Sequence, residues 1–191
     1  MPETTYANLL EVAASYATPA SDIANYIVRN YVVAPAAGIQ KFFYYSFGSS
    51  HQINRRECSG FLEWDGVPRP SAVAYAVCAW ILEDAVFAKK LTLGEGAAAY
   101  QFTKKNEKIV VLWALKNGKK EIVKLPVLPD SRVRIFNIIG NEIKINKAGD
   151  ILNLTVDYYP LYVVETIRGT KKYPGDMSKI SLFDGQREDS K

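Results

Sequence analysis

The sequence predicts an α+β fold in which a helical first half precedes an antiparallel β-sandwich. Residues 1–87 show helical spacing around one continuously apolar strand, and residues 88–168 alternate polar and apolar side chains between Gly and Asn turns. Residues 169–191 are polar and charged, which is typical of a loosely attached tail. We therefore expect two small domains, 1–87 and 88–168, followed by that tail.

The first helix is predicted to begin near Thr18, a good N-cap, with Pro19 at the first helical position. Gly38 is the expected C-cap, and Pro35 should loosen the last turn. Apolar residues at spacings of three and four predict one buried stripe, made of Ile23, Tyr26, Ile27, Tyr31 and Ala34.

The segment Ile39–Phe47 is predicted to be an apolar strand, because its stretch "FFYYSF" shows no polar alternation. Such strands are typical of parallel sheets with helices on both faces, yet this half of the chain offers few neighbours to cover it. After a polar loop, Pro70 and Ser71 open a second helix. Its predicted buried face is Val73, Val77, Trp80 and Ile81, with Ala72, Ala76 and Ala79 allowing close approach.

The second half predicts a series of short strands. Residues 97–115 form a hairpin that turns at residues 104–107, and 121–127 form another strand. Residues 132–145 form a strand pair around Gly140 and Asn141. Residues 150–165 alternate with Leu152, Leu154, Val156 and Tyr158 directed inward, so an antiparallel sandwich or barrel is expected.

Composition narrows the chemistry. The formal net charge is +4, and the lysines cluster in turns, so nucleic-acid binding is not expected. Cys58 and Cys78 form no CxxC motif, and His51 is the single histidine, so neither a metal site nor a cofactor is predicted. No apolar run reaches the length of a membrane span, and the start lacks a secretion signal. We expect a cytoplasmic protein, or a chain whose true beginning is missing, which leaves its location unknown.

Four stretches resemble parts of the C-terminal end of clan A retaining glycoside hydrolases of family 39. "ANYIVRNYVVAPAAGIQKFFYYSF" is similar to the seventh helix and eighth strand of their (β/α)8 barrel, and "GFLEWDGVPRPSAVAYAVCAWIL" to the run into the eighth helix. "YQFTKKNEKIVVLWAL" and "LTVDYYPLYVVE" resemble the first hairpin and the closing strand of their sandwich.

The resemblance implies that the first half is a remnant of a (β/α)8 barrel. A complete barrel takes about 250 residues. The chain would then be the C-terminal fragment of a glycosidase acting on O-glycosidic bonds, with the first six strands absent. A truncated frame, a trimmed piece and one part of a split enzyme all fit this expectation.

Retaining glycosidases use two carboxyl groups about 5–5.5 Å apart. By its position before the seventh helix, Glu3 matches the family's nucleophile, although a terminal carboxylate in solvent is the alternative. The acid/base Glu belongs to the absent fourth strand, and Glu57 and Glu63 are expected to be surface loop residues. The fragment alone is therefore expected to be inactive.

The resemblance also places substrate-binding residues, Tyr45, Ser46 and His51, at the catalytic face. Either Tyr44 or Tyr45 should face inward by strand alternation, where an aromatic ring can stack on a sugar. In the sandwich, Tyr158, Tyr159 and Tyr162 are the best candidates for a carbohydrate contact, but we expect them to pack against the first half.

Three hypotheses stay open at this point. The chain is a glycosidase fragment, a non-enzymatic sandwich that binds or assembles through a helical extension, or part of a split enzyme completed by a missing upstream polypeptide. The uncovered apolar strand predicts self-association, or a first half rearranged against the sandwich. The expected partner of the parent enzyme is a carbohydrate substrate. Neither a nucleic acid nor a membrane is expected as a partner. The sequence does not indicate which sugar or linkage is cleaved.

Overall fold

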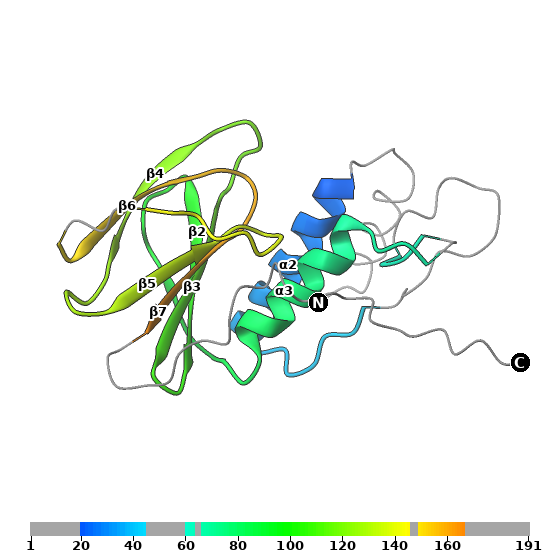
Figure 1. Ribbon diagram of the computed structural model, residues 1–191, viewed down its shortest axis with the longest axis horizontal. Coiled ribbons are helices and arrows are strands. Elements are labelled where there is room, and N and C mark those ends of the chain that lie inside the picture. The colour runs from blue at the N-terminus through cyan, green and yellow to red at the C-terminus, as the bar shows by residue number, and fades with distance from the viewer. Residues whose placement is uncertain (1–19, 45–59, 64–65, 146–148, 167–191) are drawn as a thin grey trace, which may run out of the picture.

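The computed structural model describes residues 20–44, 60–63, 66–145 and 149–166 as an α+β fold. Two helices come first in this part of the chain, and seven strands follow, all paired antiparallel. The helices lie on one side of a sheet and a smaller sheet lies on the other (Figure 1). The predicted fold class is confirmed at this level.

The helices are α2 (Ala20–Ala36) and α3 (Pro70–Leu82). Pro35 lies inside the last turn of α2, and Gly38 follows with φ at +79°, a left-handed conformation that a side chain would disfavour. Pro70 occupies the start of α3, where its missing N–H removes no helical hydrogen bond. The predicted start of α3 and the C-cap of α2 are thus confirmed.

The predicted buried stripes need correction. In α2, Tyr26 is 43% exposed and Tyr31 is partly buried, whereas Ala24, Val28 and Val32 are buried. The reason is that α2 packs both on α3 and on the sheet, so its buried arc is wider than one stripe. In α3 the expected Val77 and Ile81 are buried, but Ala76 and Ala79 are exposed and the close approach is made by Ser71, Ala74 and Cys78.

The larger sheet has five antiparallel strands in the order β1-β2-β3-β7-β5. These strands are β1 (Val86–Leu91), β2 (Ala97–Lys104), β3 (Glu107–Ala114), β7 (Leu161–Thr166) and β5 (Arg132–Phe136). The second sheet pairs β4 (Glu121–Pro126) with β6 (Ile151–Val156).

Most predicted strands are present. The β2–β3 hairpin closes at Lys105, whose φ is +48°, and Leu152, Leu154 and Val156 point inward from β6. The prediction of a strand pair around Gly140 is wrong in part. After β5, the returning segment forms a single isolated β-bridge, between Glu142 and Phe136. Strand β1 was not predicted, because its sequence shows no clear alternation. It forms an edge of the larger sheet.

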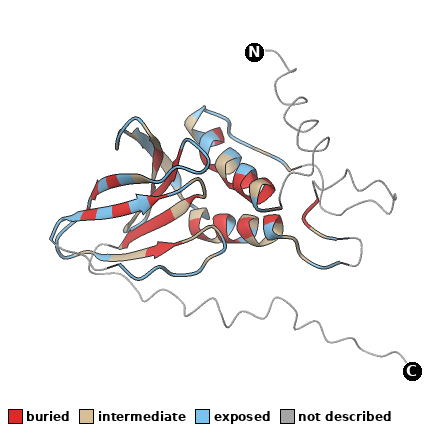
Figure 2. Cartoon of the chain, turned by 90° about the horizontal axis from the view of Figure 1, so that it is seen from above, coloured by how far each residue is buried: buried red, intermediate tan, exposed pale blue. Residues whose placement is uncertain are grey.

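The larger sheet is covered on both faces, and this explains the sequence of β3. Ile109, Val111 and Trp113 face the helices, while Val110, Leu112 and Ala114 face the smaller sheet; all six are buried. Figure 2 shows the buried residues concentrated between these layers. A strand buried on both faces needs no polar alternation, so β3 is apolar over its six buried residues, 109–114.

The apolar segment predicted as a strand over 39–47 is described up to Tyr44, and there it belongs to neither sheet. It is also not helical. A strand requires a hydrogen-bonded neighbour, and the described chain supplies none at this place. Residues 45–47 lie outside the described residues.

Candidate functional site

Four residues were predicted to carry the chemistry: Glu3, Tyr45, Ser46 and His51. All four lie outside the described residues, so the structure does not bring them together or separate them. What the structure describes in this half of the chain is Ile39–Tyr44, the turn around Gly66 and the two helices.

After a bend at Gln40, residues 41–44 alternate between exposed and half-buried side chains. Phe42 and Tyr44 contact aromatic rings carried by the helix pair and the following loop. Phe43 is 81% exposed and Lys41 is also exposed. This period of two is the geometry of an extended strand, even though the segment joins no sheet.

Five rings form an aromatic cluster, which we define as Tyr31, Phe42, Tyr44, Phe61 and Tyr75. Tyr31 meets the edge of Phe42 at 4.9 Å between ring centroids and Tyr75 at 5.1 Å. Phe61 stacks on Tyr75 at 4.9 Å and on Tyr44 at 4.6 Å. Such pairs contribute roughly 0.5–1.5 kcal/mol each beyond their buried area, so the cluster fixes the segment against the helices.

Two tyrosines of this cluster, Tyr31 and Tyr44, have raised pKa values. Burial, and then the neighbouring Tyr75, raise the pKa of Tyr31 to about 12. Burial also raises the pKa of Tyr44, although the nearby Arg69 opposes the shift. Their hydroxyl groups can therefore donate hydrogen bonds at neutral pH but cannot act as bases.

The chain between the segment and α3 turns tightly at Gly66, where φ is +83°. The Gly66 N–H donates to the Glu63 carbonyl at 3.0 Å, and Glu63 N–H donates to Val67 at 2.8 Å. Arg69 Nη2 pairs with Glu63 Oε2 at 2.8 Å. The prediction that Glu63 is a surface residue is confirmed, and its ion pair closes the turn.

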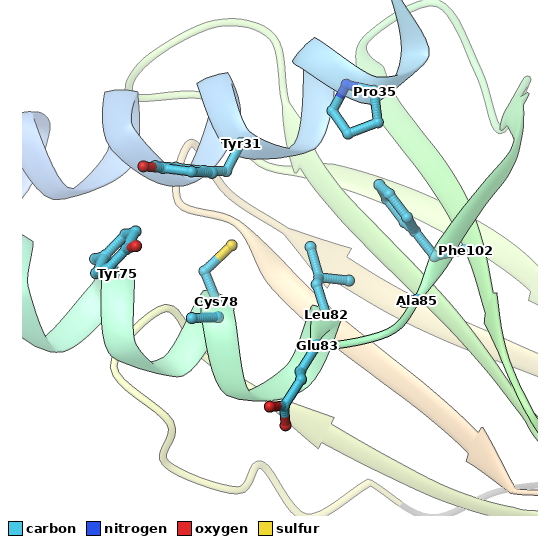
Figure 3. A pocket seen from close by; sticks show the side chains of 9 residues that line it. Tyr31, Pro35, Tyr75, Cys78, Leu82, Glu83, Ala85 and Phe102 are labelled. Carbon is cyan, nitrogen blue, oxygen red and sulfur yellow. The ribbon is translucent and has the colours of Figure 1, made fainter. Parts of the chain in front are cut away.

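A hollow of about 280 Å³ lies between the ends of the helices and β2 (Figure 3). Tyr31, Cys78, Leu82 and Phe102 line it, and Glu83 points away from it. Burial raises the pKa of the Cys78 thiol to about 11, although contact with Tyr162 opposes the shift. The thiol is therefore not a nucleophile at neutral pH.

The three sandwich tyrosines pack against other parts of the chain. Tyr159 Oη lies 3.3 Å from Ser21 Oγ and 3.4 Å from Asp22 Oδ1 in α2. Tyr162 is fully buried in the core, where its hydroxyl lies beside Cys78. Tyr158 lies under the guanidinium of Arg29, 4.0 Å from its ring centroid. These residues form no open sugar platform.

Arg29 is the residue that sequence reasoning missed. Its Nη2 donates to the carbonyl oxygens of Tyr158 and, at 3.4 Å, of Ala114, and its guanidinium lies 5.1 Å from the Trp113 ring. Burial lowers its pKa, an effect that Tyr158 opposes. A lone arginine in a helix gives no sequence signal for such a contact, which joins α2 to β3 and to the turn between β6 and β7.

The described ranges contain no cluster of three or more His, Cys, Asp or Glu side chains that could hold a metal ion. In the same ranges, neither helix is long and apolar enough to cross a bilayer.

Among solved structures, the chain resembles a family 39 glycoside hydrolase from the gut symbiont Bacteroides cellulosilyticus WH2. The TM-score is 0.63 at 25% sequence identity, over 75% of this chain and 30% of that one. The chain thus spans less than a third of that enzyme. A GH30 endoxylanase from Clostridium papyrosolvens C71 matches with a TM-score of 0.48 and 11% identity, over 78% of this chain and 38% of that chain.

An Anoxybacillus α-amylase matches with a TM-score of 0.38 and 13% identity, over 61% of this chain and 27% of that chain. No protein-family model matches the chain, and no curated protein matches it. Of these three likenesses, the one to the family 39 enzyme, with a TM-score of 0.63, supports a shared fold over the matched part of the chain.

Proposed function

We propose that this chain is the C-terminal portion of a retaining glycoside hydrolase that acts on O-glycosidic bonds. The observation that carries the proposal is the likeness to the family 39 enzyme, which extends over 75% of this chain. The counterpart makes up 30% of that enzyme, so most of a catalytic barrel has no equivalent here.

The arrangement of the first half supports the same conclusion. Figure 1 shows α2 and α3 running in the same direction, with the segment after α2 leading back toward the start of α3. A helix, a returning extended segment and a second parallel helix form the repeating unit of a (β/α)8 barrel. In the proposed enzyme, Ile39–Tyr44 begins the last barrel strand, and Tyr45, Ser46 and His51 contact the sugar.

In this function Glu3 is the nucleophile, and the acid/base carboxyl comes from the absent part of the barrel. A carboxylate without its proton-donating partner cannot complete both steps of a retaining mechanism. We expect no hydrolysis of aryl glycosides by the chain alone, and hydrolysis by the protein in which the upstream barrel is joined to it.

The decisive substitution is Glu3→Gln in that complete protein. The variant should lose the steady-state rate by orders of magnitude, because an amide cannot form the glycosyl ester. The matched control, Glu57→Gln on the predicted surface loop, should keep the wild-type kcat. Hydrolysis by the chain alone, or full activity of E3Q, would contradict the proposal.

A second candidate is a non-enzymatic module that binds or assembles through its helical extension. One observation favours it: α2, α3 and the larger sheet bury residues in a common core. A helix pair integrated in this way suits a self-contained unit. In that case neither the chain nor any longer form of it hydrolyses a glycoside.

A further inference from the structure

We propose that Asn117, in the turn between β3 and β4, is a site of spontaneous covalent modification that replaces its side-chain amide by a carboxylate. Asn117 and Gly118 form the single Asn-Gly pair of the chain. The reaction needs only water, and the site lies in the sandwich. The inference is therefore independent of the proposed function.

The turn that carries Asn117 is open. Residues 115–120 are all exposed. The Lys119 N–H donates to the Lys116 carbonyl oxygen at 3.3 Å, and Gly118 takes the third position of this turn with φ at +73°. A Cβ built on Gly118 would meet no atom within 4 Å. No described residue therefore crowds the peptide bond between Asn117 and Gly118.

The Gly118 nitrogen is the nucleophile. The hydrogen bond that closes the turn is donated by Lys119, and no described acceptor takes a bond from the Gly118 N–H. Glycine carries no Cβ, so the Asn117 side chain can reach this nitrogen. Asn137 is the opposite case, because its Oδ1 is held by two main-chain N–H groups. No described residue holds the Asn117 side chain in this way.

The atoms of the reaction balance with water alone. Hydroxide takes the Gly118 N–H proton, and the nitrogen attacks the side-chain carbonyl carbon of Asn117. The new C–N bond closes a cyclic imide, the amide C–N bond breaks, and the leaving nitrogen takes a proton from water and departs as ammonia. A water molecule then opens the imide. Opening at one carbonyl gives aspartate, and opening at the other gives an isoaspartyl linkage, in which the main chain runs through the side-chain carbon.

Charge around the turn favours the first step. The pair is preceded directly by Lys116 and followed directly by Lys119. A positive neighbour favours the deprotonated form of an ionising group, here the peptide nitrogen. The elements around this end of β3 carry further charges of both signs, on Arg29, Glu95, Glu121 and Asp157. The two lysines, joined directly to the pair, act at the shortest range.

The modification changes the surface and the connection into β4. The formal net charge of +4 falls by one when the amide becomes a carboxylate. The isoaspartyl form also adds a methylene to the main chain just before β4, whose Val123 and Leu125 are buried. Aged protein therefore becomes a mixture in which ion exchange separates the acidic forms from the original chain.

The test incubates the full chain at pH 8 and maps its peptides by mass spectrometry. Asn117 should show the mass of an amide-to-acid change and give two products, one of which an isoaspartyl methyltransferase labels. The rate should fall about tenfold for each pH unit from 8 to 6, since the ionised nitrogen becomes rarer. A synthetic peptide of residues 113–121 supplies the rate of an unrestrained pair, and the folded chain should convert within tenfold of it.

The matched control is Asn106, which is exposed in the β2–β3 turn but is followed by Glu107. It should convert at least tenfold more slowly than Asn117. Asn117→Gln should abolish conversion at this position, because the longer side chain must close a larger ring. Gly118→Ala should slow conversion at least tenfold, because a Cβ shields the nitrogen, and circular dichroism checks that the fold is kept.

The inference is overturned if Asn106 and Asn117 convert equally, or if the folded chain stays unmodified while the peptide converts. It is also overturned if the acid forms without an isoaspartyl product. Equal rates for G118A and the wild type would have the same meaning.

Discussion

Arg29 shows how one side chain joins the helices to the sandwich. Its guanidinium lies over Tyr158 and Trp113 and donates to main-chain oxygens at the end of β3 and in the turn between β6 and β7. We expect Arg29→Ala to lower the free energy of unfolding by about 2 kcal/mol, since it removes a charge-assisted hydrogen bond and a cation–π contact. Arg29→Lys, which keeps the charge but not the planar fork, should lose part of that amount. Urea denaturation followed by circular dichroism measures both, and equal stability of R29A and wild type would show that the contact is not stabilising.

Glu165 is a buried carboxylate with three partners. Its side chain forms an ion pair with Lys108 and accepts hydrogen bonds from the Leu128 N–H and, at 2.8 Å, from Ser131 Oγ. Burial alone would raise the pKa of Glu165, but the Lys108 ammonium, the Leu128 amide and the Ser131 hydroxyl outweigh it, so the pKa lies below the ordinary value of 4.5. The carboxylate is thus more acidic in the folded state than in the unfolded state.

A pH dependence follows from this direction. The unfolded state takes up the proton first as pH falls, so the stabilisation is complete above about 4.5 and is lost as pH falls through the lower folded pKa. Glu165→Gln should destabilise the protein by about 2 kcal/mol at pH 7 and by much less near pH 3. Urea midpoints of both proteins at the two pH values measure the difference. A gap that does not shrink in acid would show that ionisation of Glu165 is not the cause.

At the scale of elements, the turn after β5 lies close to α3 at Gly140. Its φ is +86°, and an added Cβ would lie 3.0 Å from Val77 Cγ2. Gly149 has a similar φ of +73° but no atom within 4 Å of the added Cβ. Gly140→Ala and Gly149→Ala should share a strain of about 1 kcal/mol, and Gly140→Ala should cost about 1 kcal/mol more from crowding. Thermal unfolding of the two variants measures this, and equal losses would mean that Val77 moves aside freely.

The elements were predictable where the signal is local. Pro70 and Gly38 mark helix ends through their own backbone chemistry, and the turn at Lys105 separates two strands of matched alternation. Tyr26 was misplaced because a stripe of large residues does not reveal that α2 has two neighbours. The return strand after Gly140 was overestimated, because pairing depends on hydrogen bonds that alternation alone cannot count.

At the scale of the whole molecule, the candidate site was predictable only through family likeness. Glu3, Tyr45, Ser46 and His51 stay predictions, as does the boundary between residues 87 and 88. Self-association of the chain also stays a prediction. Arg29 was not predictable in this way, since its hydrogen-bond partners lie more than 80 positions away along the chain. Contacts between segments so distant leave no periodic pattern in either one.

The common core of helices and sheet predicts how the chain unfolds. Val28 and Val32 of α2 and Cys78 of α3 are buried in one cluster with Tyr100 and Trp113 of the sheet. Because neither part can separate without exposing this core, we expect a single cooperative transition. Far-UV circular dichroism follows the helices, and Trp113 fluorescence follows the interface in a Trp64→Phe, Trp80→Phe background. Coincident urea midpoints would show that residues 20–44 and 66–166 unfold as one cooperative unit across the predicted domain boundary. Loss of the helical signal at a lower urea concentration would show that the sandwich is stable without the helices.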